Sequence, residues 1–440
     1  MLCAIVALPV LSEIDASHVS LLPGPEWLRE LRLAAWERFS SSAAPSESEE
    51  IWRYSRIDDL DLSRYTPPQP GRSAPLGLAD LPSHVQALVA AAGEGATVAV
   101  VHNGASLNLV GPQQGLEVDS PGPGPFGEQG DLRPPASGPA PDSFLALNAA
   151  LCEAPCRARV GAGVDVAAPL VVVHWLEGER SVVLPRLQVE LGPAASLRVV
   201  EVVASAEGDV LVVPVTELDL AAGARLGYGQ VQLLGPRSWQ VGNQSSRVSR
   251  DASLRSMSVS LGGEYARLRT GSVLDGPGGE SELLAAYFGT GHQMHDLRTV
   301  QHHAAPRARS SLLFKGAVAG TSHSVYSGLI RVEKGAKGTN AFQTNRNLVL
   351  SDGAQADSVP NLEIEDNDVR CSHASAVGPI DESQLFYLES RGVPTTTAQR
   401  LIALGFMDEV LERFPVGGLV APLRAALADK LDAAGLGAAL

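Results

Sequence analysis

The central half of the chain consists of short apolar runs separated by polar and turn-forming residues. From about residue 157 to residue 365, runs rich in Val and Leu are broken by Gly, Pro, Asp and Asn. Such runs are typical of β-strands. A motif of a small residue, a spacer and a third residue that is Leu recurs at Ala195-Ser196-Leu197, Ala224-Arg225-Leu226, Ala252-Ser253-Leu254, Ser281-Glu282-Leu283 and Ser310-Ser311-Leu312.

The spacing of this motif is nearly constant. Its first residues are separated by 29, 28, 29 and 29 positions. A fixed period of this size indicates a solenoid, and the strand-rich repeats favour a β-solenoid over a helical one. We therefore predict a mainly β protein with a solenoid core over residues 143–378. A β-sandwich is the alternative, because its strands also recur, although without a constant step.

The region before the core, residues 1–142, has a mixed pattern. Apolar positions spaced as on one helix face predict a helix at Pro25–Ser40, and Thr97–His102 is predicted to be a strand. Residues 111–142 are rich in Gly and Pro and are interpreted as a linker that ends this region. A short helix at Ser143–Leu151 is expected to lead into the core.

The last region, residues 379–440, is expected to be helical. Asp381 is a residue type that commonly begins a helix, by accepting hydrogen bonds from free backbone N–H groups. Two further helices are predicted on either side of Gly405, at Pro394–Leu404 and Phe406–Phe414.

Composition and charge mainly exclude classes of function. The chain has 440 residues, 45% of them hydrophobic, and a net charge of −15. This charge argues against a surface for nucleic acids or anionic membranes. The four cysteines are too few and too scattered for a disulfide framework. The apolar start lacks a basic segment, so we expect no signal peptide, no membrane span and a cytoplasmic location.

One histidine-rich segment has to be considered as a metal site. It contains His292, His295, Asp296, His302 and His303. The spacing does not match the helical zinc motif with two histidines four residues apart. We therefore favour the alternative, in which these side chains lie on solenoid faces and bond to neighbouring coils.

Other candidate motifs are incomplete. Cys152 and Cys156 have no second cysteine pair to complete a tetrahedral zinc site, and we expect them to be ordinary residues near a helix end. The glycines between Gly276 and Gly279 lack the Lys-Ser/Thr of a phosphate-binding loop, so no nucleotide site is expected.

Cys371 and His373 remain as two potential ligands of a soft metal. If this segment is a strand, residues two apart point to the same side, so Val369, Cys371 and His373 share one face. Two ligands are too few for an iron–sulfur cluster, which takes about four. Spacing alone therefore favours a core position for this pair.

Several runs in this part of the chain are more specific. They are Gln343 with Asn345-Arg346-Asn347-Leu348, Pro360-Asn361-Leu362-Glu363-Ile364, Val369-Arg370-Cys371-Ser372-His373, Gln384-Leu385-Phe386-Tyr387 and Arg391-Gly392. Together they closely resemble the SufB/SufD family of the SUF iron–sulfur cluster assembly system. Weaker similarity extends to Arg298–Lys315 and to Glu50–Tyr54. SufB-type chains have a cysteine where this chain has Ile364, so the resemblance is to the SufD branch.

The resemblance implies a right-handed parallel β-helix with helical regions at both ends. It also implies a non-enzymatic scaffold subunit that pairs with a SufB-like partner and binds the SufC-like ABC ATPase. A transient iron–sulfur cluster would form at the interface between the B and D subunits. No cofactor is expected to be held firmly by this chain alone, and a flavin in the complex is left open.

The resemblance also implies roles for individual residues. Cys371 and His373 would take part in cluster assembly, although Ala374-Ser375-Ala376 departs from the Gly-Ala-Thr that is usual after them. The residues implied in ATPase docking are Asp381, Gln384, Leu385, Phe386, Tyr387, Arg391 and Gly392.

Two other functions are kept as alternatives. One is a SufB-like scaffold that assembles with copies of itself. The other is a β-solenoid enzyme acting on polysaccharides, which would need clustered carboxylates on an exposed face. The acidic residues Glu363, Glu365, Asp366 and Asp368 are the candidates for such a cluster.

Overall fold

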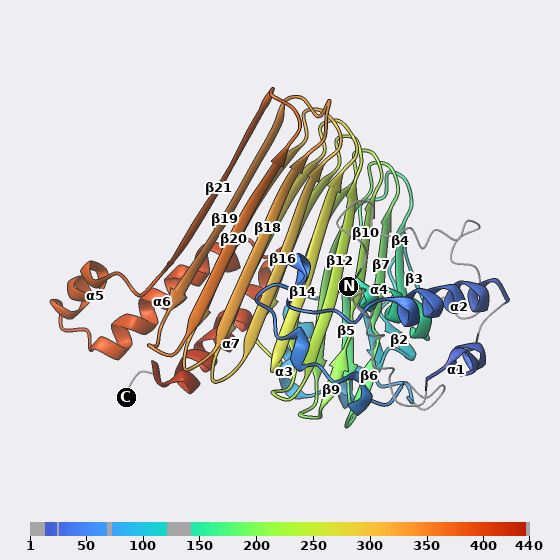
Figure 1. The fold of residues 1–440 in the computed structure, drawn as a ribbon, viewed down its shortest axis with the longest axis horizontal. Helices are drawn as coiled ribbons and strands as arrows, with labels where there is room; N and C mark the ends of the chain where they lie inside the picture. The colour runs from blue at the N-terminus through green and yellow to red at the C-terminus, as the bar shows by residue number, and fades with distance from the viewer. Residues whose placement is uncertain (1–13, 24–25, 68–72, 121–141, 437–440) are drawn as a thin grey trace, which may run out of the picture.

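The computed structural model describes residues 14–23, 26–67, 73–120 and 142–436, and the apolar N-terminal stretch lies outside them. Two long sheets face each other and form a β-solenoid of about 8 turns between residues 156 and 378 (Figure 1). The predicted solenoid is therefore confirmed, and the sandwich alternative is wrong. Successive coils pair in parallel, as expected for a chain that returns to the same sheet once per turn.

In the described part of the chain, the first sheet has ten strands. In spatial order they are β2 (Ser106–Val110), β1 (Thr97–His102), β5 (Leu170–Leu176), β8 (Ser196–Ser205), β11 (Arg225–Leu233), β13 (Ser253–Ser260), β15 (Glu280–Gly289), β17 (Arg309–Val318), β19 (Thr339–Val349) and β21 (Val369–Gly378). Residues alternate between the solenoid interior and an outer face. Because helices cover part of that outer face, strands such as β1 are buried on both sides and are almost wholly apolar.

The second sheet has eleven strands among the residues that the structure describes. Its main path is β20 (Gln355–Ile364), β18 (His323–Val332), β16 (Met294–His303), β14 (Tyr265–Leu274), β12 (Trp239–Val248), β10 (Val215–Leu220), β7 (Arg186–Leu191), β4 (Cys156–Val160) and β3 (Leu116–Asp119), and β6 (Ser181–Val183) and β9 (Val210–Val212) join beside it.

The strand register corrects the repeat seen in the sequence. Arg225 pairs with Ser196 and Ser253, at steps of 29 and 28 residues, as the motif predicts. Ser253, however, pairs with Glu280, only 27 residues later. The motif at residue 281 is therefore two positions out of structural register. A shift of two leaves every side chain on its own face, so the apolar pattern hides it.

The N-terminal end of the solenoid is closed by antiparallel strands. Strands β1 and β2 form a hairpin around Asn103 and Gly104, which both have the positive φ that this tight turn requires. Strand β3 pairs antiparallel with β4. Strand β3 also lies inside the segment 111–142 that was interpreted as a linker, so residues 116–119 are a strand rather than linker.

N-terminal helices and a docked segment lie on the second sheet. The helices are α1 (Ala16–Leu21), α2 (Glu26–Ser41) and α4 (Ser143–Leu151). Between α2 and α4, the chain forms single helical turns at Glu50–Trp52, Ile57–Asp59 and Leu62–Arg64. Trp52 is 1% exposed and belongs to the same apolar cluster as Trp239 and Tyr265 of the solenoid. We call residues 50–54 the strap.

The C-terminal helices are α5 (Glu382–Glu389), α6 (Thr395–Leu411) and α7 (Val420–Leu431), with a short irregular turn at Asp432–Leu436. Of these helices, α6 and α7 lie against the first sheet with α3 (Ser83–Ala91) packed beside them, and α5 contacts α6 without burying any of its own residues. Lys430 anchors α7, because its Nζ donates to the Phe288 carbonyl oxygen at 2.6 Å and to Gln293 Oε1 at 2.7 Å.

The prediction of two helices separated at Gly405 is wrong. Helix α6 runs through Gly405, whose backbone lies on the exposed side. Ala403, Met407 and Val410 continue a single buried face across it. The packing of that face outweighs the cost of one helical glycine, which is about 1 kcal/mol.

Candidate functional site

The C-terminal end of the solenoid is open. Among the described residues, strand β21 pairs only with β19 and β20 pairs only with β18, so both 10-residue strands of the last coil have an unpaired edge. Figure 1 shows this end of the stack, with α5 beyond the edge formed by β21. Long unpaired edges are usually covered in native proteins, so this end is suited to contact another chain.

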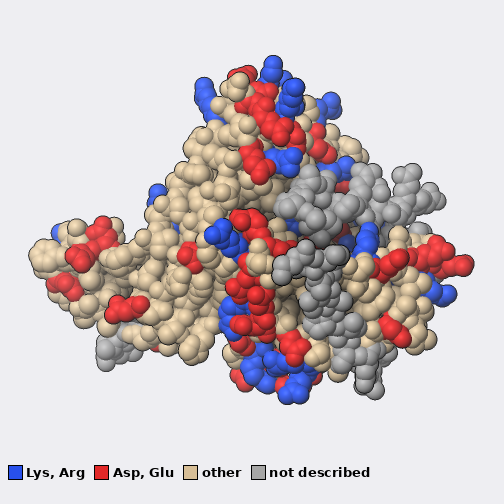
Figure 2. Space-filling model, viewed as in Figure 1, with Lys and Arg blue, Asp and Glu red and all other residues tan. Residues whose placement is uncertain are grey.

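The inner row of the last coil is partly apolar and exposed. Strand register places Leu362 and Ile364 of β20, and Val377 of β21, above inward-facing residues of the preceding coil. They are 36%, 41% and 45% exposed. In Figure 2 the surface over the last strands carries few charged side chains, in contrast to the turns at the top of the view. The open end therefore has the composition of an interface core.

Cys371 and His373 lie in this inner row. They pair in register with Ala341 and Gln343, whose side chains are buried in the interior. Cys371 is half-buried against the cluster formed by Ile330, Val332, Ala336 and Ala341, and burial raises the pKa of its thiol. His373 is exposed. The predicted alternation is thus present, and both ligand types lie on the inner face of the last coil.

Cys371 and His373 are two residue types that can bind iron. Thiolate sulfur and imidazole nitrogen are both ligands of iron in proteins. Among the described residues, no three His, Cys, Asp or Glu side chains gather so that they could hold a metal ion. These two side chains alone do not fill the ligand set of an iron–sulfur cluster, which takes about four ligands.

The predicted contacts of the histidine-rich segment with neighbouring coils are confirmed. His295 Nδ1 is 3.1 Å from Ser260 Oγ, His303 Nε2 is 2.8 Å from Ser310 Oγ, and His302 Nε2 is 2.9 Å from Glu333 Oε1. Each contact joins one coil to a neighbouring one. His292 Nδ1 is likewise 2.6 Å from Thr321 Oγ1.

Cys152 and Cys156 are buried free thiols, as expected. Cys152 ends α4 and Cys156 begins β4. Burial raises the pKa of Cys152 to about 11 and that of Cys156 to about 12. Neither thiol is ionised at neutral pH, so neither has the reactivity of a catalytic cysteine.

Helix α5 presents an exposed apolar surface. Asp381 begins it by accepting hydrogen bonds from the backbone N–H groups of Ser383 and Gln384, as predicted. Phe386 is 71% exposed and Tyr387 is 55% exposed, and the Arg391 guanidinium lies over the Tyr387 ring at 4.5 Å. Of the other residues implied in docking, Leu385 is half-buried and Gly392 ends the turn with a φ of 84°.

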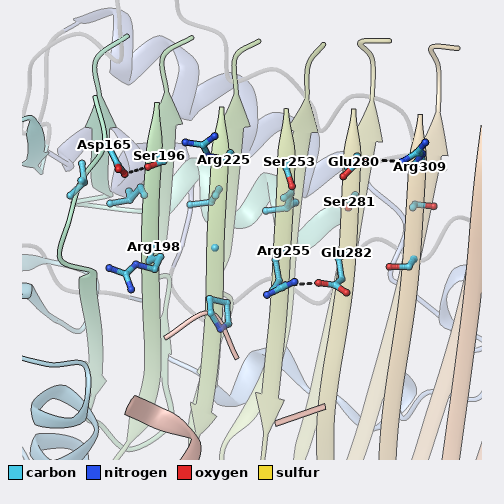
Figure 3. Close-up of a pocket in the computed structure, with 18 of the residues that line it drawn as sticks. Asp165, Ser196, Arg198, Arg225, Ser253, Arg255, Glu280, Ser281, Glu282 and Arg309 are labelled. Carbon is cyan, nitrogen blue, oxygen red and sulfur yellow. Dashed lines mark hydrogen bonds and ion pairs between the residues drawn. The ribbon is translucent and has the colours of Figure 1, made fainter. Parts of the chain in front are cut away.

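A second candidate site is a groove of about 840 Å³ on the outer face of the first sheet. Charged and polar side chains of several strands line it (Figure 3). Many of them pair with each other: Arg255 with Glu282, and Arg309 with Glu280 at 3.3 Å. Its residue Phe342 alternates with Gln343, so the groove lies on the opposite side of the sheet from the row of His373.

Comparison with known proteins gives the family. Residues 174–406, which is more than half of the chain, match the family model described as "SUF system FeS cluster assembly, SufBD core domain". An iron–sulfur cluster assembly SufBD family protein of Mycobacterium leprae is 33% identical over 342 residues, which cover 75% of this chain and 84% of the relative.

The chain belongs to the SufBD family. A SufBD family protein of Mycobacterium tuberculosis is 43% identical over 195 residues, and that match spans 49% of the relative's length. The iron–sulfur cluster assembly protein SufD of Escherichia coli is 29% identical over 293 residues, covering 66% of this chain and 69% of the relative. The SufBD protein described here is therefore SufD-like and part of the SUF system.

No helix in the described part of this SufBD chain is long and apolar enough to cross a membrane.

Sequence reasoning did not assign a role to Gln343. It belongs to a run in β19 where Gln343, Asn345 and Asn347 alternate with outward-facing residues, and all three are buried. Polar residues on the inner face of a predicted strand are unusual, because a buried polar group needs a partner. This alternation could have directed attention to β19, although Gln244 of β12 shows that buried amides also occur in other coils.

Proposed function

We propose that this chain is a scaffold subunit of a SUF assembly complex rather than an enzyme. Its open solenoid end would pair with a SufB-like partner, and a nascent iron–sulfur cluster, as the cargo of the complex, would form where the two ends meet. Residues 379–440 would bind a SufC-like ATPase. The family membership supports this proposal.

The observation that carries the proposal is the position of Cys371 and His373. Both lie on the inner face of the last coil, which is paired with the preceding coil and has its other edge unpaired. We call the exposed residues Leu362, Ile364 and Val377 of this coil its apolar rim. An interface formed there would desolvate the rim and bring a partner's ligands close to these two side chains. Because two ligands do not complete a cluster site, the partner would supply the others.

Replacing His373 by Ala is expected to reduce cluster assembly strongly. The complex would be reconstituted from this chain, its SufB-like partner and the ATPase, and iron and acid-labile sulfide would be measured after assembly. We expect at least a tenfold loss, because one ligand of a half-site is removed without disturbing buried packing.

Ser372→Ala is the matched control for this experiment. Ser372 is exposed on the outer face of the same strand, one residue away from His373. The control should assemble clusters as the unchanged complex does. Unaltered iron and sulfide in the His373 variant would overturn the proposed site.

A double substitution, Phe386→Ser with Tyr387→Ser, is expected to weaken ATPase binding by tenfold or more. Exposed aromatic side chains are the groups that most often dominate binding energy at interfaces. Neither ring is buried in the isolated chain, so folding should be unaffected. Titration calorimetry with the ATPase would measure the change.

Val110→Ser is the control for ATPase binding. Val110 is similarly exposed, at 46%, but lies on β2 at the opposite end of the solenoid. Equal affinities of the double variant and this control would show that α5 is not the docking surface.

A further inference from the structure

Gln343 is a buried polar side chain without a partner. It lies in the middle of β19 and is 1% exposed. Neither its Oε1 nor its Nε2 has a hydrogen-bond partner among the residues that the structure describes. Each buried, unsatisfied group of this kind costs about 1–3 kcal/mol, so its presence calls for an explanation.

The neighbouring amides of the same strand are fully engaged. Asn345 Nδ2 donates to Tyr287 Oη at 3.0 Å, and Tyr287 Oη donates to Asn347 Oδ1 at 2.6 Å. Asn347 Nδ2 donates to Asn345 Oδ1 at 2.8 Å. Asn345 and Asn347 therefore have hydrogen-bond partners inside the solenoid. Gln343, which faces the interior from the same strand, has none among the described residues.

The space around Gln343 is shaped to hold its amide between the sheets. Gly328 lies in β18 of the second sheet, and a Cβ at this position would collide with Gln343 Oε1 and with the Tyr326 hydroxyl. The glycine therefore leaves room for the Gln343 side chain, which reaches across the interior beneath the last coil.

Gln343 is the register partner of His373. The two residues lie on neighbouring parallel strands, and both side chains belong to the inner row. Such neighbours have strand axes about 4.8 Å apart, within reach for a glutamine and an imidazole. The His373 ring is exposed and makes no hydrogen bond or ion pair with the described residues, so it can turn toward the unpartnered Gln343 amide beside it.

We propose that Gln343 orients His373 for iron binding. When one imidazole nitrogen of His373 binds iron, the N–H of the other nitrogen would donate to Gln343 Oε1. A ligating histidine almost always donates its second N–H to such an acceptor, which fixes the tautomer and the direction of the ring. Gln343 is thus a positioning residue. The inference rests on the proposed role of His373.

Gln343→Met separates this role from a purely structural one. Methionine has a similar length and no polar group, so the variant should fold with an unchanged or higher melting temperature. We expect iron affinity of the reconstituted complex to fall by about 10-fold or more, the usual effect of removing an outer partner of a metal-bound histidine. A Gln343→Glu variant keeps an acceptor and should restore most of the affinity.

Gln244→Met is the matched control. Gln244 is also an inward-facing, buried glutamine, but its Nε2 donates to Ser256 Oγ at 2.8 Å in an earlier coil. This variant should lose stability and keep its iron affinity, the reverse of the effect at position 343.

The outcomes distinguish the two levels of the proposal. If Gln343→Met keeps its iron affinity while His373→Ala loses iron, the positioning role is wrong and the proposed function stands. If both variants keep iron, the proposed site itself fails. If Gln343→Met unfolds or melts at a much lower temperature, the residue is structural and the inference is overturned.

Discussion

Replacing Asp296 by Asn is expected to destabilise the protein by about 3–5 kcal/mol, the usual cost of removing one partner of a buried ion pair. Asp296 is fully buried in β16. Arg267 Nη1 donates to its Oδ2 at 2.6 Å, Tyr265 Oη donates to the same oxygen at 2.9 Å, and Arg298 donates to Oδ1. Without the carboxylate, two buried guanidinium groups lose their counter-charge.

The same substitution should release the strap. Arg267 Nη2 donates to the Ile51 carbonyl oxygen and Arg298 Nη2 to the Arg53 carbonyl oxygen, both at 2.6 Å. The Arg267 guanidinium also lies 3.9 Å from the centre of the Trp52 ring. Because Asp296 holds both arginines in place, its loss should make residues 50–54 accessible to protease before the solenoid unfolds.

Denaturant unfolding and limited proteolysis would measure both effects. Asp219→Asn is the matched control, because Asp219 pairs with Arg247 at 2.9 Å but is 47% exposed. Exposed pairs contribute about 0–1 kcal/mol. If the two variants differ by less than about 1 kcal/mol, Asp296 is not the anchor described here.

The fold could be predicted from the sequence because it is periodic. Each coil must return to the same sheet, so small corner residues and inward leucines recur at almost constant steps. The shorter step from Ser253 to Glu280 is not visible in the sequence pattern. A turn that is two residues shorter shifts the strand by two positions, and every side chain then stays on its own face of the sheet. Helix α6 was divided at Gly405 because local propensity was given more weight than tertiary packing.

The candidate site was only partly predictable. Alternation along a strand placed Cys371 and His373 on one face, but it could not show that the last coil is unpaired, which depends on how the whole sheet ends. The role of Asp296 was also hidden. In sequence it lies next to His295. In the structure it pairs with Arg298 of its own strand and with Arg267 of the neighbouring strand β14, and both arginines bind the distant strap.

Lowering the pH from 7 to about 5 is expected to destabilise the protein by about 4 kcal/mol through two histidines, with about 2 kcal/mol from each. Burial lowers the pKa of His295 to about 3 and that of His303 to about 4, from an ordinary value of 6.5. Both rings stay neutral in the folded protein at pH 5, whereas the unfolded chain binds a proton at each. Folding is therefore weakened as the pH falls below 6.5.

Neighbouring charges reinforce this effect. Lys430 of α7 faces His295, and His302 lies beside His303, so a proton on either buried ring would be repelled as well as desolvated. The buried carboxyl of Asp296 acts in a lower pH range. Burial alone would raise its pKa, but Arg267 and Arg298 hold the pKa below its ordinary value of 3.8. Burial lowers the pKa of Lys430 to about 7, so this ammonium adds a small part of the acid sensitivity just below neutral pH. Most of the sensitivity between pH 6.5 and about 4.5 comes from the histidines.

A double variant, His295→Gln with His303→Gln, tests this assignment, because glutamine keeps hydrogen-bonding groups and does not titrate. Its free energy of unfolding in urea should change by less than about 1 kcal/mol between pH 7 and pH 5, whereas the unchanged protein loses several times more. His84→Gln is the control, since His84 is exposed on α3 and should leave the full pH dependence in place. A double variant as acid-sensitive as this control would show that other groups take up the protons. If the free energy of unfolding of the double variant does not depend on pH in this range, the two buried imidazoles set the lowest pH at which the solenoid and its open end stay folded.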